Sequence, residues 1–533
     1  MPRLHLHNTL TRRVEPFVAA AERADASADP APGTPVAFYS CGPTVYDDAH
    51  IGNFRSFLNA DILRRTLELL GYRVRHVMNI TDVGHMTEED ADGSGEDRMA
   101  VAGRRIAEAK KSGKLPAGTE IDPGDPAVIA DFYAGRFLED GRHLGLKVAL
   151  EEAALRAAGR DSGELMPRPT RCVPQMIAMI EELVRGNHAY VAGDGAVYFD
   201  VRSFPAYGRL SGNSLDALRE GAGERISASN QAAKRHPADF LLWKPDPRHL
   251  MRWPSPWGEG YPGWHIECSA MARMLLGDEI DLHSGGEDNI FPHHECEIAQ
   301  SCCATGHALF SRFWFHTRHL QVEGDKMSKS KGNFFTARDL FARGATPAAV
   351  RLELVRTHYR VNSNFTLQGL QDCQRMIDRW ARAHAALVAR ASADAARAAR
   401  PDESRAAGPF ERGLAEFTAA LCDDLNLARA IAAVNEAVGA PAPEHAAADA
   451  QRELASLLAM DSVLGVLGRN APVAGAAPAE DPEFVARVEA LLAARAAARA
   501  AKNWPESDRV RDELATMGVA VKDGPSGVTW SRT

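Results

Sequence analysis

Two short segments near the middle of the sequence concentrate side chains that bind metal ions. They read GWHIECS and FPHHECE, and they carry His265 and Cys268, and His293, His294, Cys296 and Glu297. Pro292 favours the first turn of a helix, so His293 and Glu297, four residues apart, should share one helical face. Cys296 could share that face too, and spacing alone does not choose between them.

A further candidate ligand, Cys41, lies far upstream. With Cys268, His293 and Glu297 it would offer sulfur, nitrogen and oxygen, a donor set that suits Zn²⁺ better than Mg²⁺ or Ca²⁺. Taken one at a time, each cysteine is more simply a small buried hydrophobe and each histidine a core or surface residue. Taken as a cluster they favour a metal site.

Cys41 begins a third segment whose side chains could take part in chemistry. It reads CGPTVYDDAHIGN and ends at Asn53. An apolar run, Val36 to Tyr39, precedes it, and a helical pattern begins at Ile51, with Gly71 placed where a C-terminal cap belongs. This order predicts a strand, a loop and a helix N-terminus, which together bind phosphate. His50 and Asn53 could act on a bound nucleotide. The alternative is an ordinary strand-to-helix connection with a buried cysteine.

A fourth segment, KMSKS at 326–330, is followed by Lys331 and Gly332. Lysines on such a polar loop can neutralise a polyphosphate whose charge shifts during in-line displacement. A solvated basic turn is the competing interpretation, and the presence of HIGN upstream favours the phosphate.

These segments need a scaffold of strands and helices. A second strand is expected at Arg73 to Ile80, helices at Met99–Ala109, Ala127–His143 and Val173–Arg185, and resumption of the nucleotide-binding sheet after Asp239. From Leu367 the pattern is helical, with Leu427, Ile431, Val434 and Val438 on one face. The predicted divisions are 1–125 and 236–320 as the two halves of an α/β sheet domain, 126–235 as an insertion, 321–366 around KMSKS, 367–467 as a helical bundle, 468–481 as a linker and 482–533 as a terminal module.

Composition sets the broad class. At 533 residues and 45% hydrophobic content the chain should form several globular domains, and no apolar run is long enough to cross a bilayer. Eight cysteines in a chain of this length indicate a reducing cytoplasm rather than a disulfide framework. The net charge of −9 argues against indiscriminate coating of nucleic acid. The basic, acid-free N-terminus faintly suggests a transit peptide.

HIGN at 50–53 together with KMSKS resembles the two signature motifs of class I aminoacyl-tRNA synthetases. CGPTVYD, NITD, GWHIECS and FPHHECE narrow the resemblance to the cysteinyl-tRNA synthetase family. The C-terminal DRVRDELATMGVAVKDGPSGVTW is similar to that family's anticodon-binding module, and the opening LHLHNTLTR resembles its start, which weakens the transit-peptide interpretation. The resemblance covers nearly the whole chain and implies a Rossmann-like catalytic domain with an inserted subdomain, a helical bundle and an anticodon-binding module.

The resemblance implies that the chain activates L-cysteine with ATP and Mg²⁺ and transfers it to tRNA-Cys. ATP binding and catalysis fall on His50, Gly52, Asn53, Lys326 and Lys329. Asn53 departs from the motif, which has histidine there; an asparagine still donates a hydrogen bond but is never cationic.

The family's zinc ligands correspond to Cys41, Cys268, His293 and Glu297, so the resemblance selects Glu297 over Cys296. Its substrate-cysteine pocket corresponds to Gly42, Thr44, Thr81, Trp264 and His283. A Zn–thiolate bond would separate cysteine from serine, where a pocket shape alone gains only ~1–3 kcal/mol.

The tail should contact tRNA through its arginines and lysine, with Trp504 or Trp530 available for stacking. Its basic residues are Arg487, Arg495, Arg499, Lys502, Arg509 and Arg511. A solvated helix face with core tryptophans is the plainer interpretation, especially for Trp530. A monomer is expected, without a membrane partner.

Two other functions compete with tRNA charging. One is a ligase that joins cysteine to an amino sugar, as in the mycothiol pathway, and residues 480–533 argue against it because that relative lacks the module. The other is a non-catalytic paralogue that binds tRNA or cysteine, and the intact lysines and ligands argue against that.

Overall fold

The structure is a computed structural model, and it describes residues 2–25, 31–88, 94–112, 121–160, 163–214, 234–328, 333–394, 407–440, 447–473, 482–501, 503–517, 519–524 and 527–532.

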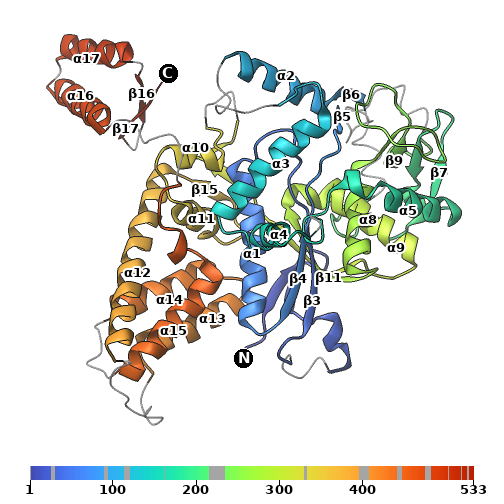
Figure 1. Ribbon diagram of the computed structural model, residues 1–533, viewed down its shortest axis with the longest axis horizontal. Helices are drawn as coiled ribbons and strands as arrows, with labels where there is room; N and C mark the ends of the chain where they lie inside the picture. Colours follow the sequence, from blue (N-terminus) through green and yellow to red (C-terminus); the bar gives the residue numbers. More distant parts are fainter. Residues whose placement is uncertain are drawn as a thin grey trace. The chain divides into compact units, whose positions relative to one another are not determined.

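A four-stranded parallel sheet forms the centre of the first part of the chain (Figure 1). Its spatial order is β12-β11-β3-β4, and the strands are β3 Pro35–Ser40, β4 Arg73–Met78, β11 Ile280–Gly286 and β12 Ser311–Thr317. These strands are mostly buried, as parallel strands covered on both faces are, although they carry several buried polar side chains. The predicted α/β class is confirmed.

Two helices connect the paired strands. α1, Ile51–Leu69, joins β3 to β4, and α9, Glu295–Thr305, joins β11 to β12. α1 ends where the sequence predicts, because Gly71 takes the positive φ of +91° that a side chain would resist. The chain leaves β3 toward one edge of the sheet and leaves β11 toward the other. A crevice at the carboxyl ends of β3 and β11 is where such sheets bind ligands.

A long excursion of the chain, residues 79–279, separates the two halves of this sheet. It contains the hairpin β5 Met86–Glu88 and β6 Ser94–Asp97, and then α2 Arg98–Lys111, α3 Pro126–His143, α4 Lys147–Ala157 and α5 Val173–Arg185. The three predicted helices match α2, α3 and α5 to within two residues. Asp97 and Asp125 cap the first two, and Pro126 occupies the first turn of α3, which is why their starts are readable.

The excursion ends in a second, antiparallel sheet of order β10-β9-β8-β7. Its strands are β7 Ala189–Val191, β8 Val197–Phe199, β9 Phe240–Lys244 and β10 Tyr261–Pro262. The prediction that the parallel sheet resumes after Asp239 is wrong, because β9 pairs with β8 and β10 instead. After α8, Trp264–Leu276, the parallel sheet resumes at Ile280.

Beyond β12 the chain forms a small sheet of order β14-β13-β15, with β13 Leu320–Val322, β14 Asp325–Lys326 and β15 Ser363–Phe365. The helices α10 Ala337–Ala342 and α11 Pro347–Val355 lie within this stretch of sequence. The predicted bundle follows, with α12 Leu367–Asp394, α13 Pro409–Cys422, α14 Leu427–Gly439 and α15 Ala447–Leu464. On α14 Leu427, Ile431 and Val434 are buried, as their spacing predicts.

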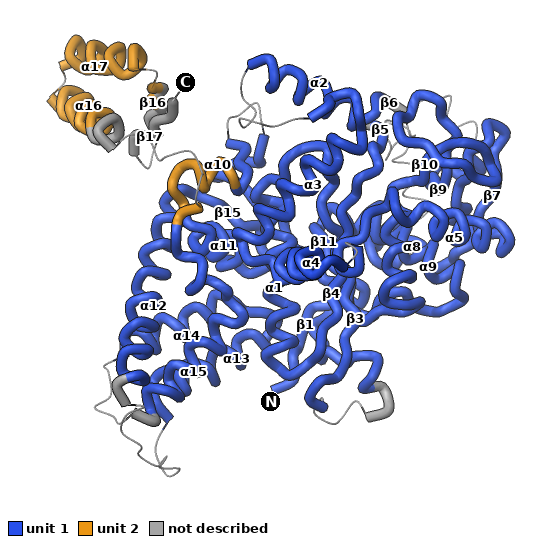
Figure 2. Tube along the Cα trace, viewed as in Figure 1, with its two compact units in different colours: residues 1–337, 346–471 blue, residues 338–345, 472–533 orange. Residues whose placement is uncertain are grey.

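The N-terminal residues form a hairpin of β1 His5–Asn8 and β2 Arg13–Pro16, followed by a 3₁₀ turn at Ala20–Asp25. At the other end are α16 Pro482–Ala500, α17 Trp504–Thr516, β16 Val519–Gly524 and β17 Gly527–Arg532. The chain divides into two compact units, residues 1–337 with 346–471, and residues 338–345 with 472–533 (Figure 2). Among the described residues, no helix has the length and apolarity needed to span a membrane.

Candidate metal centre and nucleotide-binding loops

Cys41, Cys268, His293 and Glu297 come together at the carboxyl ends of β3 and β11. The Sγ atoms of Cys41 and Cys268 are 3.8 Å apart, and Cys41 Sγ lies 3.5 Å from Glu297 Oε1. His293 Nε2 lies 3.1 Å from the same oxygen. All four side chains are buried. The structure thus gathers four predicted ligands from three separate segments into one group that could hold a metal ion.

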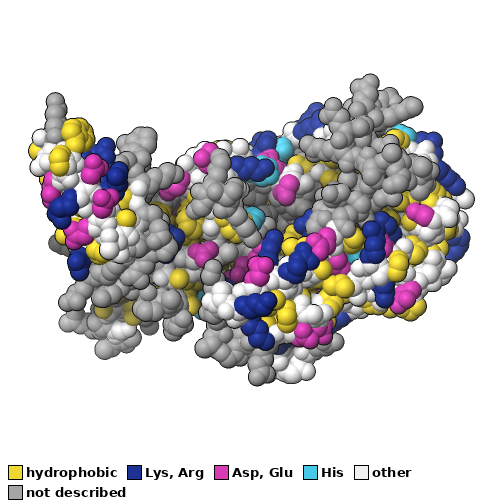
Figure 3. All heavy atoms as spheres, turned by 90° about the horizontal axis from the view of Figure 1, so that it is seen from above, with side chains coloured by type: hydrophobic (Ala, Val, Ile, Leu, Met, Phe, Trp, Pro, Cys, Tyr) yellow, Lys and Arg dark blue, Asp and Glu magenta, His cyan; other side chains and the backbone are white. Residues whose placement is uncertain are grey.

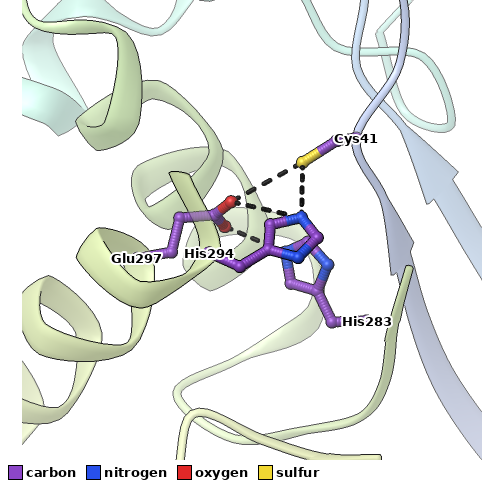
Figure 4. A group of neighbouring side chains, drawn as sticks. All are labelled: Cys41, His283, His294 and Glu297. Carbon is purple, nitrogen blue, oxygen red and sulfur yellow. Dashed lines mark hydrogen bonds and ion pairs between the residues drawn. The ribbon is translucent and has the colours of Figure 1, made fainter. Parts of the chain in front are cut away.

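A second group shares two of these residues and is drawn in Figure 4: Cys41, His283, His294 and Glu297. His294 Nε2 lies 3.3 Å from Cys41 Sγ and 3.9 Å from Glu297 Oε1. His283 Nε2 instead contacts the other carboxylate oxygen, Oε2, at 2.9 Å. In this second group the side chains do not all converge on one carboxylate oxygen.

Cys296, the alternative ligand that spacing left open, belongs to neither group found among the described residues. Its sulfur lies 3.5 Å from the hydroxyl of Tyr207. The chain is kinked before α9, because Phe291 has extended backbone angles between helical residues on either side. His293 and Glu297 still meet across this junction.

Burial shapes the protonation of the group. It raises the pKa of the Cys41 thiol well above its ordinary value. The hydrogen bond with Cys41 lowers the pKa of Cys268, but burial and the charge of Glu297 together raise it. Burial lowers the pKa of His293 to about 3. Without a cation, the group therefore holds neutral thiols and a neutral imidazole.

Two further histidines fix the orientation of the rings. His265 Nδ1 and His293 Nδ1 are 2.7 Å apart, which leaves His293 Nε2 directed at Glu297. His294 Nδ1 makes a 2.8 Å hydrogen bond with His316 Nε2. Hydrogen bonds of this kind orient histidine ligands in metal sites. His316 lies outside every motif recognised in the sequence, and only its place at the end of β12 brings it here.

Of the residues predicted to surround a substrate amino acid, Trp264 and His283 adjoin this group. Thr44 and Thr81 form a bridge between the loops after β3 and β4. Trp264 begins α8, and its ring centroid lies 5.6 Å from that of His293. The His283 ring stacks on Trp314 with centroids 4.6 Å apart.

Gly42 packs against the backbone of the loop after β4. Its N–H donates to Asn79 Oδ1 at 2.9 Å, and a Cβ on Gly42 would lie 1.8 Å from the Asn79 carbonyl oxygen. Asn79 also donates to the hydroxyl of Thr81 at 2.8 Å. No ligand spacing or charge pattern singles out Asn79 in the sequence, although it lies within NITD directly after β4.

His50 and Asn53 cap α1 reciprocally. The Asn53 N–H donates to His50 Nδ1 at 3.1 Å, and the His50 N–H donates to Asn53 Oδ1 at 3.1 Å. This capping box satisfies two backbone donors at the helix start. Because Nδ1 accepts, the neutral His50 ring carries its proton on Nε2. The cap explains why asparagine suits position 53, since its carbonyl accepts while its NH₂ remains a donor.

The KMSKS segment adjoins this helix start. The Ile51 N–H donates to the Phe335 carbonyl at 3.0 Å, and the backbones of His50 and Thr336 form an isolated antiparallel β-bridge. A Cβ on Gly52 would lie 3.0 Å from the Met327 methyl carbon. Lys326 is exposed at the end of β14, and Lys329 lies outside the described residues. The two loops predicted to meet the nucleotide are therefore neighbours.

The tail carries fewer unpaired cations than its arginine content suggests. Arg509 pairs with Glu506 and Glu513, and Arg511 lies 3.5 Å from Asp508. Arg495 is buried. Figure 3 shows a similar mixture of basic and acidic side chains over one face of the molecule. Trp504 is 56% exposed and so remains available for stacking. Lys502 and the side chain of Trp530 lie outside the described residues.

Two family models match the chain. One describes the class I (C) tRNA synthetase catalytic domain and matches residues 28–375, and the other describes the cysteinyl-tRNA ligase anticodon-binding domain and matches residues 481–530. The chain belongs to the cysteinyl-tRNA ligase family. A family member from Salinibacter ruber, named a cysteine–tRNA ligase, is 41% identical, with 100% of this chain and 98% of the relative covered.

Other family members give the same result. A cysteine–tRNA ligase from Symbiobacterium thermophilum is 39% identical over 99% of this chain and 99% of its own length. Among solved structures, a LeuRS chain in a ternary complex with tRNA and LeuAMS from Agrobacterium radiobacter has a TM-score of 0.52 at 14% identity, covering 86% of this chain and 87% of that one. That likeness supports the class I fold alone.

Proposed function

We propose that this chain is a cysteine–tRNA ligase. The carboxylate of L-cysteine attacks the α-phosphate of ATP, the bond to the β-phosphate breaks, and pyrophosphate leaves; the 3′ end of tRNA-Cys then takes the cysteinyl group and AMP departs. The observation that carries the proposal is the single segment from Cys41 to Asn53, which belongs to the metal group at one end and to the capped helix start at the other.

The attacking carboxylate is already ionised, so the reaction requires positioning and charge stabilisation more than a strong base. His50 Nε2–H, the Asn53 amide and the N-terminus of α1 are the proposed donors to phosphate oxygens, with Gly52 allowing close approach. Lys326 and Lys329 would neutralise the charge that develops on the leaving pyrophosphate. Magnesium would accompany ATP, because it binds polyphosphate oxygens.

Zinc fits the group Cys41, Cys268, His293 and Glu297. Bond lengths of about 2.3 Å to sulfur and about 2.0 Å to oxygen in a tetrahedron place two sulfurs about 3.8 Å apart and sulfur and oxygen about 3.5 Å apart. The observed separations are 3.8 and 3.5 Å. Zinc held there would offer its affinity for thiolate, which serine does not match.

Gly42, Thr44, Thr81, Trp264 and His283 are the proposed contacts of the cysteine substrate. Gly42 directly follows Cys41, His283 Nε2 lies 2.9 Å from Glu297 Oε2, and the Trp264 ring centroid lies 5.6 Å from that of His293, which supports this assignment. The bundle and the terminal module would contact tRNA-Cys, with Trp504 stacking on an unpaired base.

We also place the protein in the cytoplasm. All eight cysteines are free thiols and seven are buried, which suits a reducing compartment. The monomeric state remains a prediction that sedimentation of the purified protein would check.

Two assays with the same purified chain test the function. Cysteine-dependent exchange of pyrophosphate into ATP should be present, which a non-catalytic paralogue would lack. Aminoacylation of tRNA-Cys should also be present, which a ligase for an amino sugar would lack. Exchange without aminoacylation would overturn the proposal in favour of another cysteine ligase, and activity with serine in place of cysteine would overturn the assigned substrate. The match to the terminal module at 481–530 disfavours the amino-sugar ligase.

A further inference from the structure

Three consecutive side chains in the loop before His50 have no part in the proposed chemistry, yet each contacts an arginine from outside the loop. The pairs are Tyr46 with Arg98, Asp47 with Arg105, and Asp48 with Arg136. Arg98 and Arg105 belong to α2, and Arg136 belongs to α3. Two helices of the excursion thus contact the loop that carries HIGN.

The strongest of these contacts joins Arg136 to Asp48. It is bidentate, with Nε 2.5 Å from Oδ1 and the terminal nitrogen 2.8 Å from Oδ2. Both side chains are about one-fifth exposed, so solvent weakens the pair only in part. The Asp48 carboxylate helps to raise the pKa of the Arg136 guanidinium against the opposing effect of burial.

The other two contacts extend the same face. Arg105 donates to Asp47 Oδ2 at 2.9 Å. Arg98 donates to the Tyr46 hydroxyl at 2.7 Å, and its guanidinium carbon lies 5.0 Å from the centre of the Tyr46 ring. Arg136 is also influenced by the carboxylate of Asp140, which helps to raise the pKa of its guanidinium.

Both helices are themselves held in place. Phe137 on α3 stacks on Phe54 of α1, with ring centroids 5.5 Å apart. α2 packs so tightly against the turn before α3 that a Cβ on Gly103 would lie 2.2 Å from the Pro123 carbonyl oxygen. The arginines thus project from a scaffold anchored to α1, the helix whose start binds phosphate in the proposed function.

We propose that α2 and α3 form a brace for the nucleotide-binding loop, and that Arg136 and Arg105 are positioning residues for ATP. The proposal rests on the proposed function, because it takes the N-terminus of α1 as the phosphate site. Asp48 lies two residues before His50, where an uncompensated carboxylate repels a polyphosphate. Arg136 neutralises that carboxylate through the bidentate pair.

Calorimetric titration with ATP and Mg²⁺ tests the brace without any amino acid, so its result is separate from the question of which amino acid is activated. Arg136→Gln should weaken ATP binding roughly tenfold, as expected for one uncompensated charge near a polyphosphate. Asp48→Asn in the same chain should restore most of the affinity, because it removes the carboxylate that Arg136 neutralises. The loss should shrink as salt rises, because salt screens repulsion.

Arg104→Gln is the matched control. Arg104 lies on α2 and pairs with Glu96, an exposed residue outside the loop, so this variant should bind ATP as the parent does. Circular dichroism and thermal melting check that each variant folds. Unchanged affinity in Arg136→Gln would overturn the brace, as would a loss that Asp48→Asn does not restore or that salt does not reduce. A parent that binds ATP but shows no cysteine-dependent exchange would overturn the proposed function alone.

Discussion

The buried thiols of Cys41 and Cys268 tie metal affinity to pH. Their raised pKa values mean that both are protonated near neutrality, and a zinc ion must displace both protons to bind. Zinc affinity should therefore rise with pH by up to about 100-fold per unit. His293 adds no slope near neutrality, because its pKa of about 3 leaves it neutral there.

Competition with a chelator of known pH dependence, measured at several values between pH 6 and 8, checks this slope. Affinity that is flat over that range would show that the thiols are already ionised or do not bind the metal.

Replacing Cys268 by serine should remove zinc and cysteine activation together, because an alcohol is a far poorer zinc ligand than a thiolate. Metal content and cysteine-dependent exchange are the measurements. Cys302→Ser is the matched control, since Cys302 is a buried thiol on α9 outside both metal groups. Normal exchange in Cys268→Ser would refute the ligand assignment.

Glycine is required at position 42 for a steric reason. Gly42→Ala places a Cβ 1.8 Å from a backbone oxygen of Asn79 and should destabilise the protein by about 3 kcal/mol or more, with loss of exchange activity. Urea unfolding measures the change. Gly135→Ala on α3 meets nothing within 4 Å and should instead add up to about 1 kcal/mol, so equal effects in the two variants would contradict the steric account.

At the scale of elements, one buried arginine joins α1 to the segment before the bundle. Arg55 donates to four backbone carbonyls, those of Arg318, Leu354, His358 and Val361. Burial lowers the pKa of its guanidinium to about 10, so it remains charged at neutral pH. Arg55→Met leaves these carbonyls without their donor and should destabilise the fold by about 3–5 kcal/mol.

Urea unfolding with the more conservative Arg55→Lys as comparison tests this joint. The lysine keeps the charge but cannot match the planar fork, so its loss should be smaller but still measurable. Equal stability of the arginine, lysine and methionine forms would mean that the four hydrogen bonds contribute nothing net.

Elements with local signals were predictable from sequence, and those that depend on distant partners were not. Asp125 and Pro126 mark the start of α3, and Gly186 marks the end of α5. β9 is an apolar run whose antiparallel partners are set by tertiary pairing, so the prediction that it continues the parallel sheet is wrong.

The same division holds within the site. Residue types and spacing suggested the four metal-group residues individually, and the family resemblance selected them as a set. Spacing could not exclude Cys296, because only the fold turns its sulfur toward Tyr207. The place of His294 beside Cys41 and the hydrogen bond from Asn79 to Thr81 also depend on how β3, β4 and β11 lie together.

At the scale of the whole molecule, the terminal unit should matter for tRNA and little for activation. A chain that ends at Val473 keeps the contacts of Asn470 with Gln374 and Asp378, so the bundle stays intact. It should exchange pyrophosphate nearly as the full chain does, while tRNA charging falls by about 100-fold or more, the equivalent of ~2.7 kcal/mol of binding. Steady-state kinetics of both reactions on the two chains provide the measurement, and equal losses would make the unit structural.

β3 pairs directly with β11, with Phe38 opposite Leu282 and Ser40 opposite Ser284. The chain that leaves the sheet for the excursion therefore returns beside a strand that precedes it, and this pairing is the base of the excursion. Loop-closure entropy grows slowly with length, by only ~0.6 kcal/mol for each doubling. The excursion can therefore tolerate insertions far from its base, for example a grafted tag at the exposed turn between β7 and β8 around Gly193. Within the same fold, the length of this region is free to vary independently of the sheet that holds the site.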